Sequence, residues 1–377
     1  MNIQEDSLKC FGDQITGLIS GNNLSRETAR KMMMDTLTGL QPDLQQGAFL
    51  ASLRMKGETE DEIVGCFDAI IESDTNSVNL DDLPVVENCG TGMDSLKTFN
   101  ISTLSAIVAA CMDVPIARHG ARAISSKCGT VDLCEALGVD VDCSVNTVKE
   151  SIEQCGLGLF NGTSAEVHPM GLGRILSQIR FGTTLNIAAS LANPALPKLA
   201  VRGVGAPEQI EPTLEVMKRI GYQKGLVFHG FNMDKTAGMD ELSTLGVSKV
   251  GFFKKNGDTE YFEIKPEDTD LSTGDYDDIK PDIDRNSEAL RAVLLLAGKS
   301  SRSRIDIVSL NAGAILWMAE KVGNLREGVA AAKNIINEGS ALKKLISWVK
   351  TQNREPESGK NQIESLCTKG SVSFVSL

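Results

Sequence analysis

Residues 90–103 combine glycines, hydroxyls and an amide in an order that can hold a phosphate group. The segment reads GTGMDSLKTFNIST and follows LPVVENC at 83–89, which has the texture of a short buried strand. Glycines allow the backbone to approach an anion closely, and the free N–H groups at a helix start bind phosphate oxygens. A glycine turn alone is weak evidence, but its continuation into Asn100, Ser102 and Thr103 adds neutral donors.

A second polar segment lies at 118–130 and reads RHGARAISSKCGT. Its three cationic side chains, Arg118, Arg122 and Lys127, stand among hydroxyls and small residues. Taken alone, such a segment is typical of a solvated basic loop. Close to a phosphate-binding turn, the same residues would form a clamp for phosphate and pyrophosphate.

A third candidate is the carboxylate pair Asp240-Glu241 in GMDELS, downstream of the strand-like run LVFHG. Adjacent acidic residues are commonly only surface charge. Hard carboxylate oxygens are, however, the ligands that Mg²⁺ takes beside a phosphorylated substrate. The three segments together therefore indicate phosphate and metal chemistry.

The elements that must position these residues divide into two kinds. Residues 1 to about 75 read as helices, with Ser25 as an N-cap and a capping box at Thr59–Glu62. From about residue 83 short strand-like runs alternate with helices such as 285–297 and 325–349, which predicts an α/β domain. The acidic stretch 265–284 reads as a surface loop.

Composition excludes several other classes of protein. The net charge of 38 − 50 = −12 argues against broad nucleic-acid binding, which depends on basic side chains. Nine scattered cysteines without a CxxC pair are typical of reduced thiols, and three histidines make a zinc site improbable. Neither a secretory signal nor an apolar run of about 18 residues is present, so we expect a cytoplasmic protein without a membrane span.

Seven segments in order resemble motifs of the anthranilate phosphoribosyltransferase family. They are GAFLASLRMKGET, GTGMDSLKTFNIST, RHGARAISSKCGTVDLCEALGV, LANPA, VFHG, GMDELS and IVSLNAGAILWMA. The resemblance implies a small helical domain at 1–75, with a later contribution from about 145–180. It also implies a larger α/β domain at 80–350, with a central mainly parallel sheet flanked by helices. Residues 351–377 would be a polar C-terminal tail, either poorly ordered or packed.

The resemblance further implies a homodimer that binds 5-phosphoribosyl 1-pyrophosphate (PRPP) with two Mg²⁺ ions and transfers the phosphoribosyl group to an aromatic amine. By motif match, the metal would be organised by Ser102, Asp240 and Glu241. The donor would be held by Gly90, Thr91, Gly92, Asp94, Thr98, Asn100, Ser102, Thr103, Arg118, Ser125, Ser126 and Gly129. The acceptor would lie against Gly92, His119, Ala121, His168, Arg174 and Arg180.

Several positions depart from the family pattern. Met93 and Ser95 stand where the family has glycine, and Ala121 stands where it has an asparagine that faces the acceptor. The arginine that holds the acceptor carboxylate in the family falls at Leu176. Arg174 or Arg180 could replace it, although a helix would direct them differently from position 176.

These departures leave three functions open. The first is anthranilate phosphoribosyl transfer in tryptophan biosynthesis. The second is a related transferase that uses another aromatic amine or a nitrogen heterocycle. The third is a non-catalytic or nucleic-acid-binding paralogue, which the acidic charge and the retained Asp240-Glu241 pair disfavour.

Overall fold

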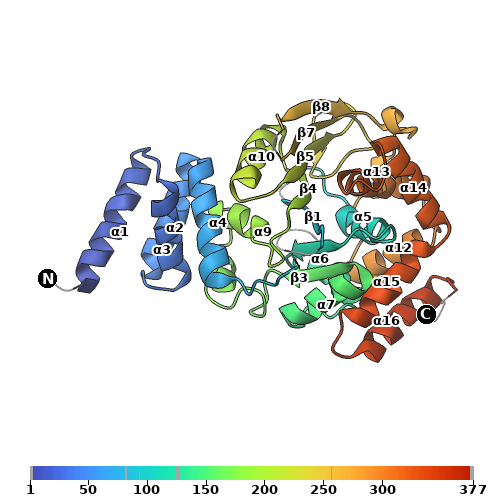
Figure 1. The fold of residues 1–377 in the computed structure, drawn as a ribbon, viewed down its shortest axis with the longest axis horizontal. Helices are drawn as coiled ribbons and strands as arrows, with labels where there is room; N and C mark the ends of the chain where they lie inside the picture. The colour runs from blue at the N-terminus through green and yellow to red at the C-terminus, as the bar shows by residue number, and fades with distance from the viewer. Residues whose placement is uncertain (1–2, 81–82, 93, 124–127, 256, 374–377) are drawn as a thin grey trace.

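A helical part and a larger α/β part lie side by side in the structure, a computed structural model (Figure 1). It describes residues 3–80, 83–92, 94–123, 128–255 and 257–373. The N-terminus lies at the outer end of the helical part, and the C-terminus lies at the far side of the α/β part. The expected fold class, a helical domain beside a mainly parallel sheet flanked by helices, is confirmed.

The helical part begins with four helices whose ends carry the expected capping signals. Ser25 accepts a hydrogen bond from the Thr28 amide, and Thr59 and Glu62 form a reciprocal capping box. Apolar side chains such as Phe49 and Ile70 are fully buried between the helices. The four helices are α1 (Ile3–Ile19), α2 (Arg26–Leu37), α3 (Asp43–Lys56) and α4 (Glu60–Asp74).

Two later helices, α8 (Leu172–Ile179) and α9 (Thr184–Leu191), share the buried core of the helical part. We expected this later contribution from about 145–180. Within that range, α7 (Val145–Cys155) and β3 (Leu157–Asn161) belong to the α/β part instead, because β3 pairs with the sheet. All five residues of β3 are buried. Its sequence therefore lacks the alternation of apolar and polar residues that marks a half-exposed strand.

The α/β part is built on one eight-stranded sheet with the order β3-β2-β1-β4-β5-β7-β8, in which β6 pairs with the end of β5. Strands β3, β2, β1, β4 and β5 are parallel, and β6, β7 and β8 are antiparallel to their neighbours. The remaining strands are β1 (Val86–Gly90), β2 (Ile116–Gly120), β4 (Leu199–Gly203), β5 (Lys224–Phe231), β6 (Gly238–Met239), β7 (Ser248–Lys254) and β8 (Glu260–Ile264).

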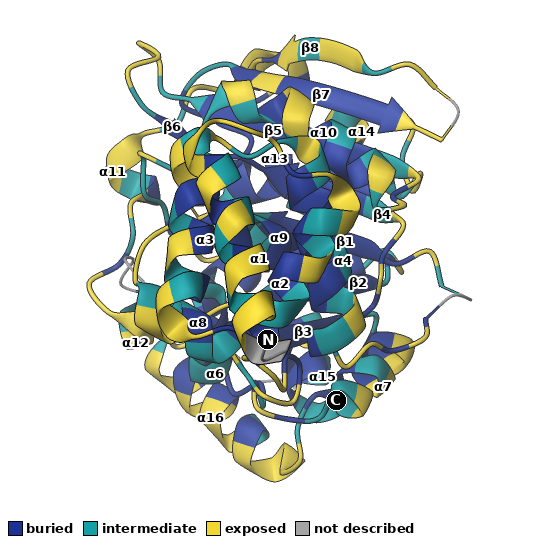
Figure 2. Cartoon of the chain, turned by 90° about the vertical axis from the view of Figure 1, so that its left-hand side faces the viewer, coloured by how far each residue is buried: buried dark blue, intermediate teal, exposed yellow. Residues whose placement is uncertain are grey.

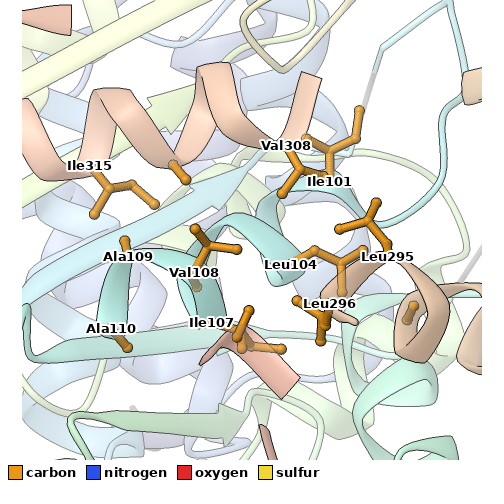
Figure 3. Close-up of a cluster of buried hydrophobic side chains, with 14 of the residues drawn as sticks. Ile101, Leu104, Ile107, Val108, Ala109, Ala110, Leu295, Leu296, Val308 and Ile315 are labelled. Atoms are coloured by element: carbon orange, nitrogen blue, oxygen red, sulfur yellow. The ribbon is translucent and has the colours of Figure 1, made fainter. Parts of the chain in front are cut away.

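Helix α5 (Ile101–Ala110) lies at the centre of the main core, and all but one of its residues are buried. Figure 3 shows its side chains Leu104 and Val108 among residues of α12 and α13. Full burial of one such aliphatic side chain stabilises the fold by about 1.5–3 kcal/mol. This packing holds the amino end of α5 at the sheet edge. The other helices here are α6 (Thr130–Ala136), α10 (Ile210–Arg219), α11 (Tyr276–Ile279), α12 (Arg285–Leu296), α13 (Arg302–Met318), α14 (Leu325–Asn337), α15 (Ser340–Thr351) and α16 (Pro356–Lys369).

The structure also shows what becomes of two polar stretches. The range 265–284, expected to be a surface loop, contains a 3₁₀ turn and the short helix α11, which buries Ile279. In the range 351–377, expected to be a polar tail, α16 packs against the α/β part. Its inner face buries Ile363 and Cys367, while its outer face is exposed (Figure 2).

Among the described residues, no helix is long and apolar enough to cross a membrane. The nine cysteines are all free thiols, and six of them are buried.

Candidate active site

The carboxyl ends of the parallel strands converge on one edge of the sheet, where open α/β sheets bind their ligands. Strand β1 ends at Gly90 and β4 at Gly203, and the two glycines are paired in register. Neither has room for a side chain, because a Cβ on Gly203 would lie 1.7 Å from the Asp240 carbonyl oxygen. The expected glycine turn therefore lies directly against the expected metal-binding pair.

The glycine turn is tied to Asp240 through its backbone. Gly92 has a φ of +69° and its N–H donates to Asp240 Oδ2 at 2.7 Å. The Thr91 N–H donates to the Gly203 carbonyl at 3.2 Å, and the buried Thr91 hydroxyl has no partner in the described part of the chain. Met93, which stands where the family has glycine, lies outside the described residues.

Two side chains after the turn hold its shape, and the sequence pattern did not single out either for this role. The Ser95 hydroxyl interacts with both the N–H (3.1 Å) and the carbonyl (3.2 Å) of Gly238 in β6. The Lys97 ammonium lies 2.8 Å from Asp94 Oδ1 and 3.0 Å from the Gly92 carbonyl. Ser95 thus attaches the turn to β6, the strand directly before Asp240.

The amino end of α5 presents the other expected phosphate ligands. The Ser102 N–H donates to Glu241 Oε1 at 2.9 Å, and the Asn100 N–H donates to Glu288 Oε1 at 2.9 Å. The Thr103 hydroxyl is buried without a described partner, and Thr98 is half-buried. Glu288 was missed at the sequence level. Its only signal is an acidic residue on the otherwise apolar, buried face of an amphipathic helix.

The Arg118 side chain points into the core and contacts the amino end of α5. It does not face outward, where it could have bound phosphate directly. Its guanidinium donates to the Ser102 carbonyl at 2.7 Å, to the Ser102 hydroxyl at 3.2 Å and to the Asn88 side chain. The side chain is only 2% exposed, because β2 directs it into the core between the sheet and α5. The arrangement makes Arg118 a residue that positions Ser102.

The two carboxylates downstream of β6 lie in a strongly acidic setting. Burial and the neighbouring Asp94 carboxylate raise the pKa of Asp240 to about 6. Burial, followed by the charge of Asp240, raises the pKa of Glu241 well above its ordinary value, although Arg118 opposes the shift. Without a cation, the place where the glycine turn meets α5 therefore disfavours having both carboxylates ionised at once.

This donor set fits Mg²⁺. All of its candidate ligands, the carboxylates of Asp240 and Glu241 and the hydroxyl of Ser102, are hard oxygen atoms, and the raised carboxylate pKa values call for a cation. Over the described ranges no three His, Cys, Asp or Glu side chains group closely enough to hold a metal by themselves. Mg²⁺ commonly takes one or two carboxylates and completes its shell with water and substrate phosphates.

The segment after β2 closes back on itself. The Asp132 carboxylate accepts hydrogen bonds from the N–H groups of Ala123 (2.8 Å) and Gly129 (2.9 Å). Arg122 pairs with Asp132 and Glu135, so its charge is already compensated. Ala121 is exposed, whereas Ser125, Ser126 and Lys127 lie outside the described residues.

His119 and His168, expected at the acceptor, do come together from β2 and the loop before α8. Their Nε2 atoms lie 3.2 Å apart, and both rings are buried. His168 Nδ1 lies 2.6 Å from the Asp74 carbonyl, which can only accept, so Nδ1 carries the proton. In the neutral pair His119 Nε2 then donates to His168 Nε2, and His119 Nδ1 is left as an acceptor. Burial lowers the pKa of both rings, which keeps them uncharged at neutral pH.

The arginines expected to hold an acceptor carboxylate are not equivalent. Arg174 is committed to the helical part, where it donates to Asp43, Gln46 and the Thr36 carbonyl. Leu176 packs beside the same helical core. Arg180 is exposed at the end of α8 with a φ of +54°, and its only described partner is the Ser177 carbonyl. These contacts point Arg174 away from the sheet edge.

Comparison with known protein families defines the class first. The glycosyl transferase family, a/b domain, matches residues 82–342, and the glycosyl transferase family, helical bundle domain, matches residues 13–74. The fold described above is therefore that of a glycosyltransferase, and the chain is an enzyme of this class.

The relatives narrow this class. The chain is 33% identical to the anthranilate phosphoribosyltransferase of Methanosphaera stadtmanae over 338 residues, which cover 88% of this chain and 96% of the relative. It is 33% identical over 353 residues to that of Methanothermobacter marburgensis, covering 91% and 99%. The chain belongs to the anthranilate phosphoribosyltransferase family.

Solved structures agree with this assignment. The Thermus thermophilus anthranilate phosphoribosyltransferase superposes with a TM-score of 0.80 at 32% identity, covering 90% of this chain and 98% of that one. The Saccharomyces cerevisiae enzyme in complex with PRPP and Mg superposes with a TM-score of 0.79. At 21% identity and with 91% and 98% of the chains covered, the yeast structure supports the shared fold.

Proposed function

We propose that this chain transfers the 5-phosphoribosyl group of PRPP to the amino group of anthranilate, with release of pyrophosphate, in tryptophan biosynthesis. One observation carries the proposal. The glycine turn, the amino end of α5 and the Asp240-Glu241 pair are joined by two direct hydrogen bonds, from Gly92 to Asp240 and from Ser102 to Glu241. Phosphate-binding amides thus adjoin metal-binding carboxylates.

The assignment of individual residues is part of the same proposal. Ser102, Asp240 and Glu241 organise Mg²⁺, and we propose two ions. Arg118 acts through Ser102. The donor is held by Gly90, Thr91, Gly92, Asp94, Thr98, Asn100, Ser102, Thr103, Ser125, Ser126 and Gly129. The yeast relative was solved in complex with PRPP and Mg, which supports the choice of these two ligands.

Catalysis would depend on stabilising the departing pyrophosphate. When the ribosyl C1–O bond breaks, negative charge builds on the leaving group, and the backbone N–H groups of the turn and of α5 are oriented to meet it. Bound Mg²⁺ would supply further charge neutralisation. An aromatic amine is neutral at pH 7 and attacks C1 with its lone pair, so no strong general base is required.

The acceptor would lie against the neutral histidine pair, with Gly92 and Ala121 nearby. His119 Nδ1 has no partner in the described part of the chain, and it would accept a hydrogen bond from the acceptor N–H and so orient the attacking nitrogen. Arg174 is not among the proposed acceptor ligands, because Asp43, Gln46 and the Thr36 carbonyl already engage its guanidinium. Arg180 remains a candidate for the acceptor carboxylate.

The decisive experiment follows anthranilate fluorescence with PRPP and Mg²⁺ present or omitted. We expect a loss of signal that requires both and that falls by at least about 100-fold in Asp240→Asn, because the variant loses a charged metal ligand. Asp234→Asn is the matched control, since Asp234 is an exposed carboxylate in the nearby loop before β6. Equal rates in the two variants would contradict the metal-binding role of Asp240.

A second candidate function has a specific observation in its favour. Leu176 replaces the usual arginine, Arg174 is engaged elsewhere and the two histidines are uncharged. An acceptor site with so little positive charge suits an aromatic amine or nitrogen heterocycle that has no carboxylate. A panel of such acceptors, compared by kcat/KM, tests this function; turnover of aniline-type amines at tenfold the anthranilate value would favour it over the first.

We also propose, from the family resemblance, that the enzyme is a homodimer in the cytoplasm. Sedimentation velocity on the purified chain tests the dimer, and fractionation of the native cells tests the location. A monomer across the micromolar range would contradict the first of these.

A further inference from the structure

Both backbone amides best placed to hold the donor pyrophosphate donate, in this structure, to side-chain carboxylates. The Gly92 N–H lies 2.7 Å from Asp240 Oδ2, and the Ser102 N–H lies 2.9 Å from Glu241 Oε1. The Gly92 amide belongs to the glycine turn and the Ser102 amide to the start of α5, whereas the two acids are consecutive in the chain.

A carboxyl oxygen and a phosphoryl oxygen compete for the same N–H, because each is a hydrogen-bond acceptor. The carboxylates that cover the amides are also the groups proposed to bind Mg²⁺. We infer that the Asp240 and Glu241 carboxylates compete with pyrophosphate for the Gly92 and Ser102 amides, and that these carboxylates would leave the amides on binding Mg²⁺. The inference rests on the proposed function and deepens it.

The surrounding contacts indicate that the Asp240 side chain, rather than the glycine turn, moves when the Gly92 amide is released. Ser95 ties the turn to Gly238, and Lys97 ties the Gly92 carbonyl to Asp94. The Ser102 end of α5 is similarly held by Arg118 from below. The amides therefore keep their direction, and a change in the Asp240 side-chain torsions is enough to expose one of them. Bound Mg²⁺ would then have two separable effects. It would screen the charge of pyrophosphate, and it would leave the Gly92 and Ser102 N–H groups free to donate to pyrophosphate.

Two variants of one residue separate these effects. Asp240→Asn and Asp240→Ala each remove one negative charge, but the asparagine carbonyl oxygen can still accept from the Gly92 N–H, whereas alanine leaves that N–H uncovered. Binding of inorganic pyrophosphate to the full chain is measured by calorimetry in EDTA and in Mg²⁺. Thermal unfolding of each variant serves as the control for folding.

In EDTA we expect Asp240→Ala to bind pyrophosphate at least about tenfold more tightly than Asp240→Asn, the change that one uncovered charge-assisted hydrogen bond produces. Asp94→Asn, which removes a charge from the same cluster without uncovering the amide, should resemble Asp240→Asn. Equal affinities of the alanine and asparagine variants would overturn the inference and leave the proposed function intact. Failure of the wild type to bind pyrophosphate even with Mg²⁺ would instead contradict the donor site on which both depend.

Discussion

The histidine pair illustrates how single residues acquire their properties from their surroundings. His119 and His168 come from segments 49 positions apart, and each ring loses its hydration in the contact. Desolvation disfavours the charged form of histidine, which is why the pKa of both falls. The Asp74 carbonyl then selects the tautomer of His168, and through it that of His119.

This burial predicts a pH dependence of stability. In the unfolded chain both histidines take up protons below about pH 6.5, whereas the folded state resists protonation, so the free energy of unfolding decreases as the pH falls below that value. We expect a slope of about 1 kcal/mol per pH unit for each histidine. Urea unfolding between pH 7.5 and 5 measures it, and His119→Gln should reduce the slope. An unchanged slope would contradict the assignment.

At the scale of elements, the contact between the end of α4 and the start of α8 depends on one buried carboxylate. Asp74, the last residue of α4, accepts hydrogen bonds from the N–H groups of Met170 (2.5 Å), Gly171 (3.0 Å) and Leu172 (2.7 Å). Its side chain thereby serves the free amides at the start of a helix 98 residues away. The carbonyl of the same residue orients His168, so Asp74 also positions the histidine pair proposed to contact the acceptor.

We therefore expect Asp74→Ala to lower the free energy of unfolding by about 2–4 kcal/mol, because three buried N–H groups lose a charged partner. Denaturation in urea measures the loss. Asp68→Ala is the matched control on the same helix; it breaks a partly exposed ion pair with Arg26 and should cost about 1 kcal/mol or less. A similar loss in both variants would show that Asp74 does not have this role.

At the scale of the whole molecule, the polar C-terminal segment is part of the core. Helix α16 packs against α12 and α15, and Gln352 just before it hydrogen-bonds both the N–H and the carbonyl of Leu159 in β3. The segment thus secures the edge strand of the sheet, which would otherwise expose its backbone. Composition predicted polarity here and could not reveal the one apolar face.

This packing predicts a large effect of a single truncation in α16. Ile363→Ala should destabilise the chain by about 2–5 kcal/mol, since the side chain is fully buried. Glu364→Ala, at the next and exposed position, should change stability by less than about 0.5 kcal/mol. Tryptophan fluorescence during urea unfolding reports both, because Trp348 is buried in the adjoining α15. Equal stabilities would mean that α16 is not part of the cooperative core.

The sequence by itself determined the features that depend on neighbours along the chain. The caps at Ser25 and Thr59, the glycine turn at 90–92 and the α/β texture were all readable, because backbone propensity and short-range hydrogen bonds decide them. The motifs also sufficed for the family. Leu176, which stands where the family has an arginine, indicated that the acceptor site differs. The sequence did not show which residue takes the place of that arginine.

Only the tertiary structure decided which groups meet. Asp240 reaches the Gly92 amide across 148 positions, Arg118 turns inward to Ser102, and Arg174 pairs with the helical part. β3 became a strand through its pairing with β2. These outcomes depend on long-range packing and on the burial of charge, which are properties of the assembled core and have no local signal in the chain.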